Sequence, residues 1–132
     1  MKKIFLIFTI FVCLLNAGNF KEGMIAYKNG DFKKAKILFE LAIKNDGATQ
    51  PYFMLGKMYL YGEGVRINRK EAIKYLQKSA KKGNIRAKCY LAEAYLKDNN
   101  NKDKAMKLLK YGLKRKIREC KKIARIYNIT LN

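Results

Sequence analysis

The sequence predicts an all-α fold in which about three and a half helical hairpins stack as a solenoid behind an N-terminal signal peptide. Between Leu55 and Asn84, apolar residues recur at helical spacing on both sides of Gly62-Glu63-Gly64, which indicates two amphipathic helices folded against each other. The same pattern returns 36 positions later, where Leu91, Ala92 and Tyr95 replace Leu55, Gly56 and Tyr59. A repeat of this length is typical of stacked hairpins, which form surfaces that hold a partner.

The first 17 residues have the organisation of a secretory signal peptide. Lys2 and Lys3 precede an apolar run from Ile4 to Leu15, and Asn16-Ala17-Gly18 follows. The run is shorter than the roughly 20 apolar residues that span a bilayer as a helix. We therefore expect cleavage after Ala17, no stable transmembrane span after cleavage, and a periplasmic or secreted product, the periplasm of a double-membraned bacterium being the favoured site.

The remaining residues, 18–132, are enough for one domain. Its predicted parts are hairpins at about 20–45, 48–83 and 84–116 and a capping helix at 117–128. Gly30-Asp31 marks the turn of the first hairpin, because glycine accepts the conformation that ends a helix and aspartate caps the next one. The third hairpin lacks the Gly-x-Gly pattern and has a shorter turn at Lys97–Asn101.

Residues 48–83 resemble a Sel-one-like repeat, a form of tetratricopeptide repeat whose helices are joined by a longer glycine-containing loop. The matching residues are Leu55, Gly56, Tyr59, Gly62, Gly64, Val65, Asn68, Ala72, Tyr75, Ala80 and Gly83, followed by Asn84. Residues 26–35 more loosely resemble a tetratricopeptide turn. The resemblance implies a right-handed α/α superhelix. In the loop, we expect Asn68 to cap the second helix and Glu71 to reach back to it.

Positive charge dominates the chain, with 30 Lys and Arg against 10 Asp and Glu. By segment, the net charge rises from +2 (six basic, four acidic) over 19–47, through +6 (eight, two) over 48–83, to +10 (fourteen, four) over 84–132. Two interpretations stay open. The lysines are solvated helix faces, which is the usual meaning of such runs, or they form a basic face for an anionic envelope surface.

Two cysteines, Cys89 and Cys120, remain once Cys13 leaves with the signal segment, and an oxidising compartment would allow them to join. Both are predicted on first helices of consecutive repeats. Helix axes pack about 8 to 10 Å apart, whereas a disulfide requires α-carbons within roughly 7 Å, so a bridge is left open. Cysteine-rich Sel-one-like proteins carry cysteine pairs eight residues apart, but Gly112 occupies the partner position of Cys120.

Little in the sequence indicates catalysis, and neither a metal site nor a cofactor is expected. The chain has no histidine, the commonest general base and zinc ligand. Ser79-Ala80-Lys81-Lys82 does spell the Ser-x-x-Lys motif of penicillin-recognising enzymes. Since the cysteine-rich relatives are associated with β-lactamase and penicillin-binding activity, such an activity is the alternative to a binding role. No catalytic residue is assigned.

The favoured function is an exported scaffold for protein–protein interactions, with the first helices of successive repeats lining a concave surface. Repeat equivalence gives the candidate partner-binding residues Lys57, Tyr61, Lys88, Glu93 and Arg125. The expected partner is a peptide or protein of the cell envelope. Nucleic acid is not expected, because an exported protein would not meet it; a host-directed secreted factor is a further alternative.

Overall fold

The computed structural model describes residues 1–46, 48–99 and 101–130, with side chains described outside 5–17 and 45–46. The prediction of an all-α fold is confirmed. The described residues form seven helices, which are α1 (Lys2–Lys28), α2 (Phe32–Asp46), α3 (Thr49–Tyr61), α4 (Arg69–Lys81), α5 (Ile85–Lys97), α6 (Lys102–Lys114) and α7 (Arg118–Ile126).

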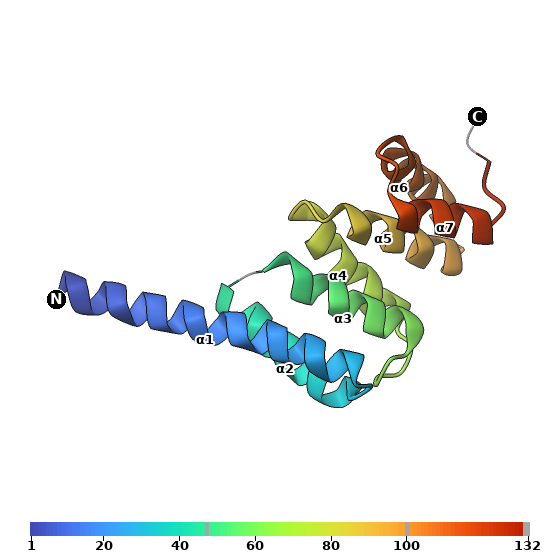
Figure 1. Cartoon of the computed structure of the whole chain (residues 1–132). Coiled ribbons are helices and arrows are strands. Elements are labelled where there is room, and N and C mark those ends of the chain that lie inside the picture. Colours follow the sequence, from blue (N-terminus) through green and yellow to red (C-terminus); the bar gives the residue numbers. More distant parts are fainter. Residues whose placement is uncertain (47, 100, 131–132) are drawn as a thin grey trace.

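Successive helices form three hairpins, α1/α2, α3/α4 and α5/α6, and α7 closes the stack by packing on α5 and α6. Figure 1 shows this progression along the chain from the first hairpin to the red C-terminal helix. The predicted solenoid of about three and a half hairpins is therefore the observed architecture. Adjacent hairpins meet mainly through α2 against α3 and α4 against α5.

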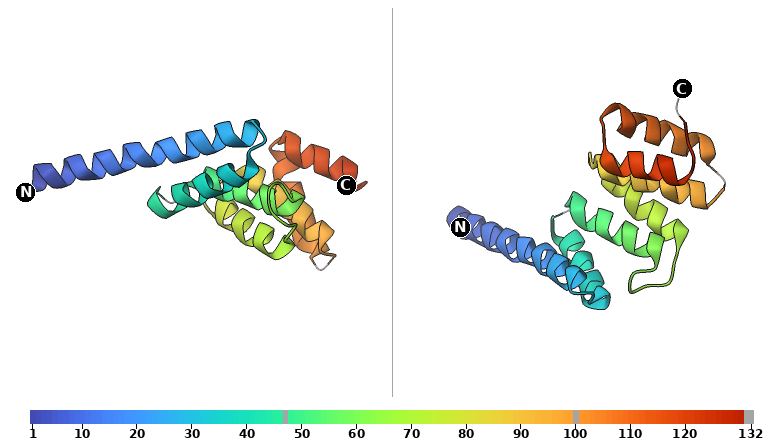
Figure 2. Two further views of the ribbon diagram at one scale, coloured as in Figure 1. Left: turned by 90° about the horizontal axis from the view of Figure 1, so that it is seen from below. Right: turned by 45° about the vertical axis from the view of Figure 1, so that its right-hand side comes forward.

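Helix α1 differs from the expectation that the first hairpin begins near Phe20, because it runs without interruption from Lys2 to Lys28. Its N-terminal half extends past α2 and away from the other helices (Figures 1 and 2). The segment Asn16-Ala17-Gly18 contains no proline and does not break the helix. Among the described residues, no helix is long and apolar enough to cross a membrane.

The core follows the apolar stripes of α3 and α5. Leu55 and Leu91 are almost completely buried, and so are Gly56 and Ala92 beside them. A β-carbon on Gly56 would lie 2.6 Å from Cγ of Leu76, so the absence of a side chain lets α4 approach α3 closely. The repeat pattern of small and large residues thus sets the spacing of the helices.

The loop between α3 and α4 crosses back toward the first hairpin. Gly62 ends α3 in the left-handed conformation, at φ 75°, and its N–H donates to the Met58 carbonyl. Asn68 caps α4 by accepting a hydrogen bond from the Glu71 N–H at 3.1 Å. The expectation that Glu71 reaches back is wrong, because the Asn68 N–H donates to the Tyr59 carbonyl and the Glu71 carboxylate pairs with Lys74.

Candidate functional site

The first helices α1, α3 and α5 present a connected group of aromatic and charged side chains, which we call the tyrosine cluster: Tyr27, Lys57, Tyr61, Tyr90 and Glu93. Lys57 lies at its centre, with its Nζ 5.5 Å from the centroid of the Tyr27 ring and 5.7 Å from that of Tyr90. Both distances are within the range of cation–π attraction. The cluster therefore crosses three successive first helices rather than belonging to one hairpin.

Helical spacing explains why these residues meet. Phe53, Lys57 and Tyr61 are four positions apart on α3 and so lie on one side of it. On α5, Tyr90 faces this side and makes edge-to-face contacts with Phe53 at 5.3 Å and with Tyr61 at 6.2 Å between ring centroids. The aromatic rings thus add a contact between α3 and α5 to the main α4–α5 interface of the second and third hairpins.

Two tyrosine–carboxylate hydrogen bonds hold the cluster in place. Tyr61 donates to Glu93 at 2.5 Å, and Tyr27 donates to Glu63 of the α3–α4 loop at 2.6 Å. Burial, followed by the hydrogen bond to the carboxylate, raises the pKa of each tyrosine well above its ordinary value. Both hydroxyls therefore stay protonated donors to a higher pH than that of an ordinary tyrosine.

Glu93 is the most deeply buried charged group of the cluster. Its side chain is only 7% exposed, and the Nζ of Lys97 lies 3.8 Å from its carboxylate. A buried carboxylate needs such partners, because an unpaired charge is costly to remove from water. Tyr61, by contrast, is 39% exposed, so the same hydrogen bond fixes an accessible aromatic ring.

Three of the five predicted partner-binding residues, Lys57, Tyr61 and Glu93, come together in this cluster. Lys88 instead faces α6, where its Nζ lies 3.9 Å from the centroid of the Tyr111 ring. Arg125 is exposed on α7. Within the described residues, no hydrogen bond, ion pair or ring contact joins Lys88 or Arg125 to the cluster.

The predicted partner-binding residues did not include Tyr27 or Tyr90, which the structure places in the tyrosine cluster. Tyr27 lies in the last turn of α1, and Tyr61 lies in the last turn of α3. Comparing the ends of these two helices could therefore have indicated Tyr27 from the sequence. Tyr90 had no such signal, because its spacing on α5 is equally compatible with core packing. Only the meeting of α3 and α5 shows that it contacts Lys57.

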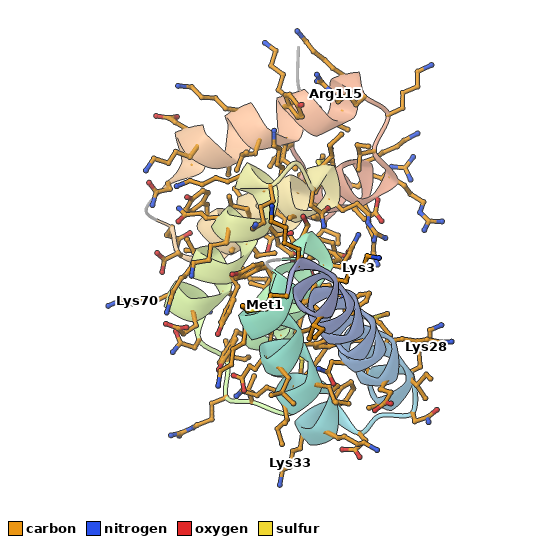
Figure 3. The ribbon with its side chains drawn as sticks, turned by 90° about the vertical axis from the view of Figure 1, so that its left-hand side faces the viewer. Met1, Lys3, Lys28, Lys33, Lys70 and Arg115 are labelled. Atoms are coloured by element: carbon orange, nitrogen blue, oxygen red, sulfur yellow. A yellow bond between two sulfur atoms is a disulfide. The ribbon has the colours of Figure 1, made fainter. Side chains whose placement is uncertain are left out.

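Basic side chains project from several sides of the molecule. Lys28, Lys33 and Lys70 are exposed and point outward in different directions in Figure 3. Arg115 is also exposed, with its guanidinium over the Tyr111 ring at 3.7 Å from the centroid. The four ion pairs formed among the described residues involve Lys36, Lys74, Arg86 and Lys97. Most of the positive charge therefore faces solvent.

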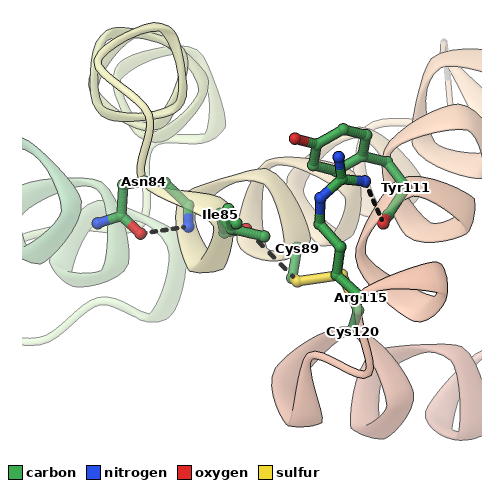
Figure 4. The surroundings of a disulfide bond; sticks show 7 residues. Asn84, Ile85, Cys89, Tyr111, Arg115 and Cys120 are labelled. Carbon is green, nitrogen blue, oxygen red and sulfur yellow. Dashed lines mark hydrogen bonds between the residues drawn. A yellow bond between two sulfur atoms is a disulfide. The ribbon is translucent and has the colours of Figure 1, made fainter.

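Cys89 and Cys120 form a disulfide that joins α5 to α7, with α-carbons 4.8 Å apart (Figure 4). The spacing of helix axes left this bridge open, but α-carbons lie about 2.3 Å from a helix axis. Where two α-carbons face each other across a helix interface, the distance between them is therefore about 4.6 Å shorter than the distance between the two axes. Gly112 on α6 makes the room, because a β-carbon there would lie 2.1 Å from Cys120 Sγ and 3.3 Å from Cys89 Sγ.

Ser79 has a packing role in the structure. It is fully buried, and its hydroxyl donates to the Thr49 carbonyl at 2.9 Å, which ties α4 to the start of α3. Lys82, the other member of the Ser-x-x-Lys pattern, is exposed beyond the end of α4. A nucleophile must be accessible to its substrate, so this geometry disfavours the β-lactamase alternative.

Comparison with protein families bears on the first two hairpins. The model of the Sel1 repeat, the Sel-one-like repeat named above, matches residues 22–47 and 52–84. The matched segments cover the end of α1 with α2, and α3 with α4, so the match includes the first hairpin, for which the sequence suggested only a looser likeness. Residues 22–84 therefore carry Sel1 repeats, which are helical hairpins of the tetratricopeptide-like class.

Proposed function

We propose that this chain is an exported scaffold that holds a peptide or protein partner against the face formed by α1, α3 and α5. Sel1 repeats generally serve as scaffolds for protein interactions. We assign binding to this face because the ammonium group of Lys57 lies between the rings of Tyr27 and Tyr90.

The composition of this face suits a protein partner. Tyrosine offers a large contact area with little loss of side-chain entropy and is enriched where proteins bind. Tyr61 is partly exposed while Glu93 anchors its hydroxyl, so the ring is held in place before a partner arrives. A preorganised ring lowers the ordering cost of binding.

Export is part of the proposal. The lysines and apolar run at the N-terminus have the form of a signal peptide, with cleavage proposed after Ala17. The Cys89–Cys120 disulfide supports export, because such bonds persist in oxidising compartments and are rare in the cytosol. The partner would then be a peptide or protein of the envelope or the surroundings.

A photo-crosslinking experiment tests the binding face. A photoreactive amino acid replaces Tyr61 in the full chain, and a control carries it at Ile37 of α2, which is 58% exposed. With envelope extract, we expect a discrete adduct at position 61 alone, and at least a tenfold loss of that adduct when Lys57→Ala is added. Equal adducts at both positions, or an adduct indifferent to Lys57→Ala, would contradict the assignment.

Cell fractionation tests export separately. We expect the chain in the periplasm or the medium, shortened at its N-terminus to begin at Gly18, as read by mass spectrometry. A full-length chain in the cytosol would contradict export without affecting the crosslinking result.

A further inference from the structure

A second surface, away from the tyrosine cluster, lies between α4, α5 and α6. It is an open groove of about 600 Å³. Its floor is apolar and comes from all three helices, with Ala80, Leu91 and Leu108 as the principal residues. Leu91 is only 5% exposed, so the floor is recessed below the surface.

Four lysines surround this floor, namely Lys81, Lys88, Lys104 and Lys107, and no acidic residue lines the groove. None of the four belongs to an ion pair formed within the part of the chain that the structure describes. Among the described residues, their ammonium groups therefore have no carboxylate within ion-pair distance. An apolar floor with a cationic rim is complementary to a ligand that is apolar at its centre and anionic at its edges.

Hydrogen bonds and ring contacts fix parts of the groove wall. Gln77 of α4 donates to the Tyr95 hydroxyl of α5 at 2.8 Å. Lys104 lies 5.9 Å from the centroid of the Tyr95 ring, and Lys88 lies 3.9 Å from that of Tyr111. These contacts hold the ammonium groups of two rim lysines near aromatic rings, so the cationic rim is partly positioned without a ligand.

We propose that the groove binds an acidic amphipathic helix of a partner protein. Such a helix would place leucine-like residues, recurring every three or four positions, on the floor and glutamate or aspartate beside the lysines. The open shape admits a peptide segment, and the charge on the rim selects an acidic one. This surface is separate from the proposed α1–α3–α5 face, so each can be tested without the other.

The recessed floor argues against a membrane surface as the occupant. A face that binds a bilayer inserts protruding apolar side chains into the headgroup region. Among the described side chains, the exposed large apolar residues, such as Ile25, Ile37, Ile67 and Ile126, lie outside the groove. Leu91 of the groove is only 5% exposed instead, so a flat lipid surface would meet the rim lysines before it meets this leucine.

The test is fluorescence anisotropy with the full chain and a labelled peptide of two Leu-Glu-Ala-Leu-Leu-Glu-Ala heptads. The groove variant combines Lys88→Gln, Lys104→Gln and Lys107→Gln. The control combines Lys110→Gln, Lys114→Gln and Lys122→Gln, which removes the same charge from exposed positions outside the groove. Circular dichroism verifies that both variants remain helical.

We expect the groove variant to raise the Kd at least tenfold and the control to change it less than twofold. Replacing the peptide's glutamates by glutamine, or its leucines by serine, should each weaken binding to the native chain by a similar factor. Equal losses in the two variants would show unspecific charge attraction and overturn the proposal. So would binding of phosphatidylglycerol vesicles that depends on the groove lysines when the peptide does not bind.

Discussion

The junction between the first and second hairpins differs from the junction between the third hairpin and α7. At the second hairpin, the loop Gly62–Asn68 reaches back to the first hairpin, where Tyr27 donates to Glu63 and Gly64 lies against Phe32 of α2. At the third hairpin, the turn between Lys97 and Lys102 is short, and a disulfide joins α5 to α7 instead. The first junction is held by packing and hydrogen bonds, and the second by packing and a covalent bond.

The lengths of the elements account for the difference. A long loop contains enough residues to contact a preceding hairpin, whereas a short turn does not. Helix α7 has nine residues and buries mainly Cys120, Ile123 and Ala124. So small an apolar face contributes little burial energy, and a crosslink that lowers the entropy of the unfolded chain compensates for it.

The largest effect should come from breaking the disulfide. The bridge spans 31 residues, so its loss should lower the free energy of unfolding by roughly 3 to 4 kcal/mol on the chain-entropy model. Urea unfolding of the native chain with and without dithiothreitol measures the change. Hydrogen exchange should show protection lost first in α7.

The matched control is the double variant Cys89→Ala/Cys120→Ala, whose stability dithiothreitol should leave unchanged. A change below about 0.5 kcal/mol on reduction of the native chain would mean that α7 is held by packing alone, and the proposed contrast between the junctions would fail.

The next largest effect should come from Gly64→Ala in the docked loop. Gly64 has φ 69°, and a β-carbon there would lie 2.4 Å from Cβ of Phe32 and 3.1 Å from its carbonyl carbon. The backbone of α2 cannot move aside easily, so we expect a loss of about 2 to 3 kcal/mol in the free energy of unfolding.

Gly30→Ala separates the two causes of this loss. Gly30 has φ 81°, but nothing lies within 4 Å of its β-carbon position. It should therefore show only the cost of the left-handed conformation, about 1 kcal/mol. Equal losses for the two variants would indicate that docking of the loop on α2 contributes nothing.

The smallest effects should come from removing the two tyrosine hydroxyls. Tyr61→Phe leaves the buried Glu93 carboxylate without its shortest hydrogen bond, so we expect a loss of about 2 kcal/mol. Tyr27→Phe removes the hydrogen bond to the less buried Glu63, so we expect the free energy of unfolding to fall by only about 1 kcal/mol. Urea unfolding at neutral pH measures both, and the reverse order would contradict the assigned burial.

The same variants have a predicted pH signature. Because the pKa of Tyr27 and of Tyr61 is raised in the fold, the unfolded chain loses these protons first as pH rises above about 10. The native chain should therefore lose stability above that pH, whereas below it the contribution is fully present. Each phenylalanine variant should lose stability less steeply over the same range.

Much of the fold was predictable because it depends on local patterns. Leu55, Gly56 and Tyr59 recur at a fixed interval, and helical spacing alone indicates the stripe that they bury. The cap at Asn68 was predictable for the same reason, since a side chain and an amide three residues on are neighbours in any helix start. The extension of α1 to Lys2 was not predictable. The apolar pattern of the first hairpin begins at Phe20, and it does not say how far the helical backbone continues toward the N-terminus.

The candidate sites were less predictable, because they depend on contacts between hairpins. Repeat equivalence proposed five partner-binding residues together. In the structure Lys57, Tyr61 and Glu93 come into one cluster, whereas Lys88 faces α6. A position in a repeat gives the rotation of a side chain about its own helix. It does not say which neighbouring helix covers that side.

The sequence by itself determined the helices, their pairing into hairpins, the glycine loop and the excess of positive charge, because each depends on residue type and short-range spacing. Only the tertiary structure decided that Lys57 lies between Tyr27 and Tyr90, that Gly112 makes room for the Cys89–Cys120 bond, and that four lysines surround one apolar groove. The reason is physical: helix periodicity is local, whereas the distance between two helices depends on the side chains that both bring to their interface.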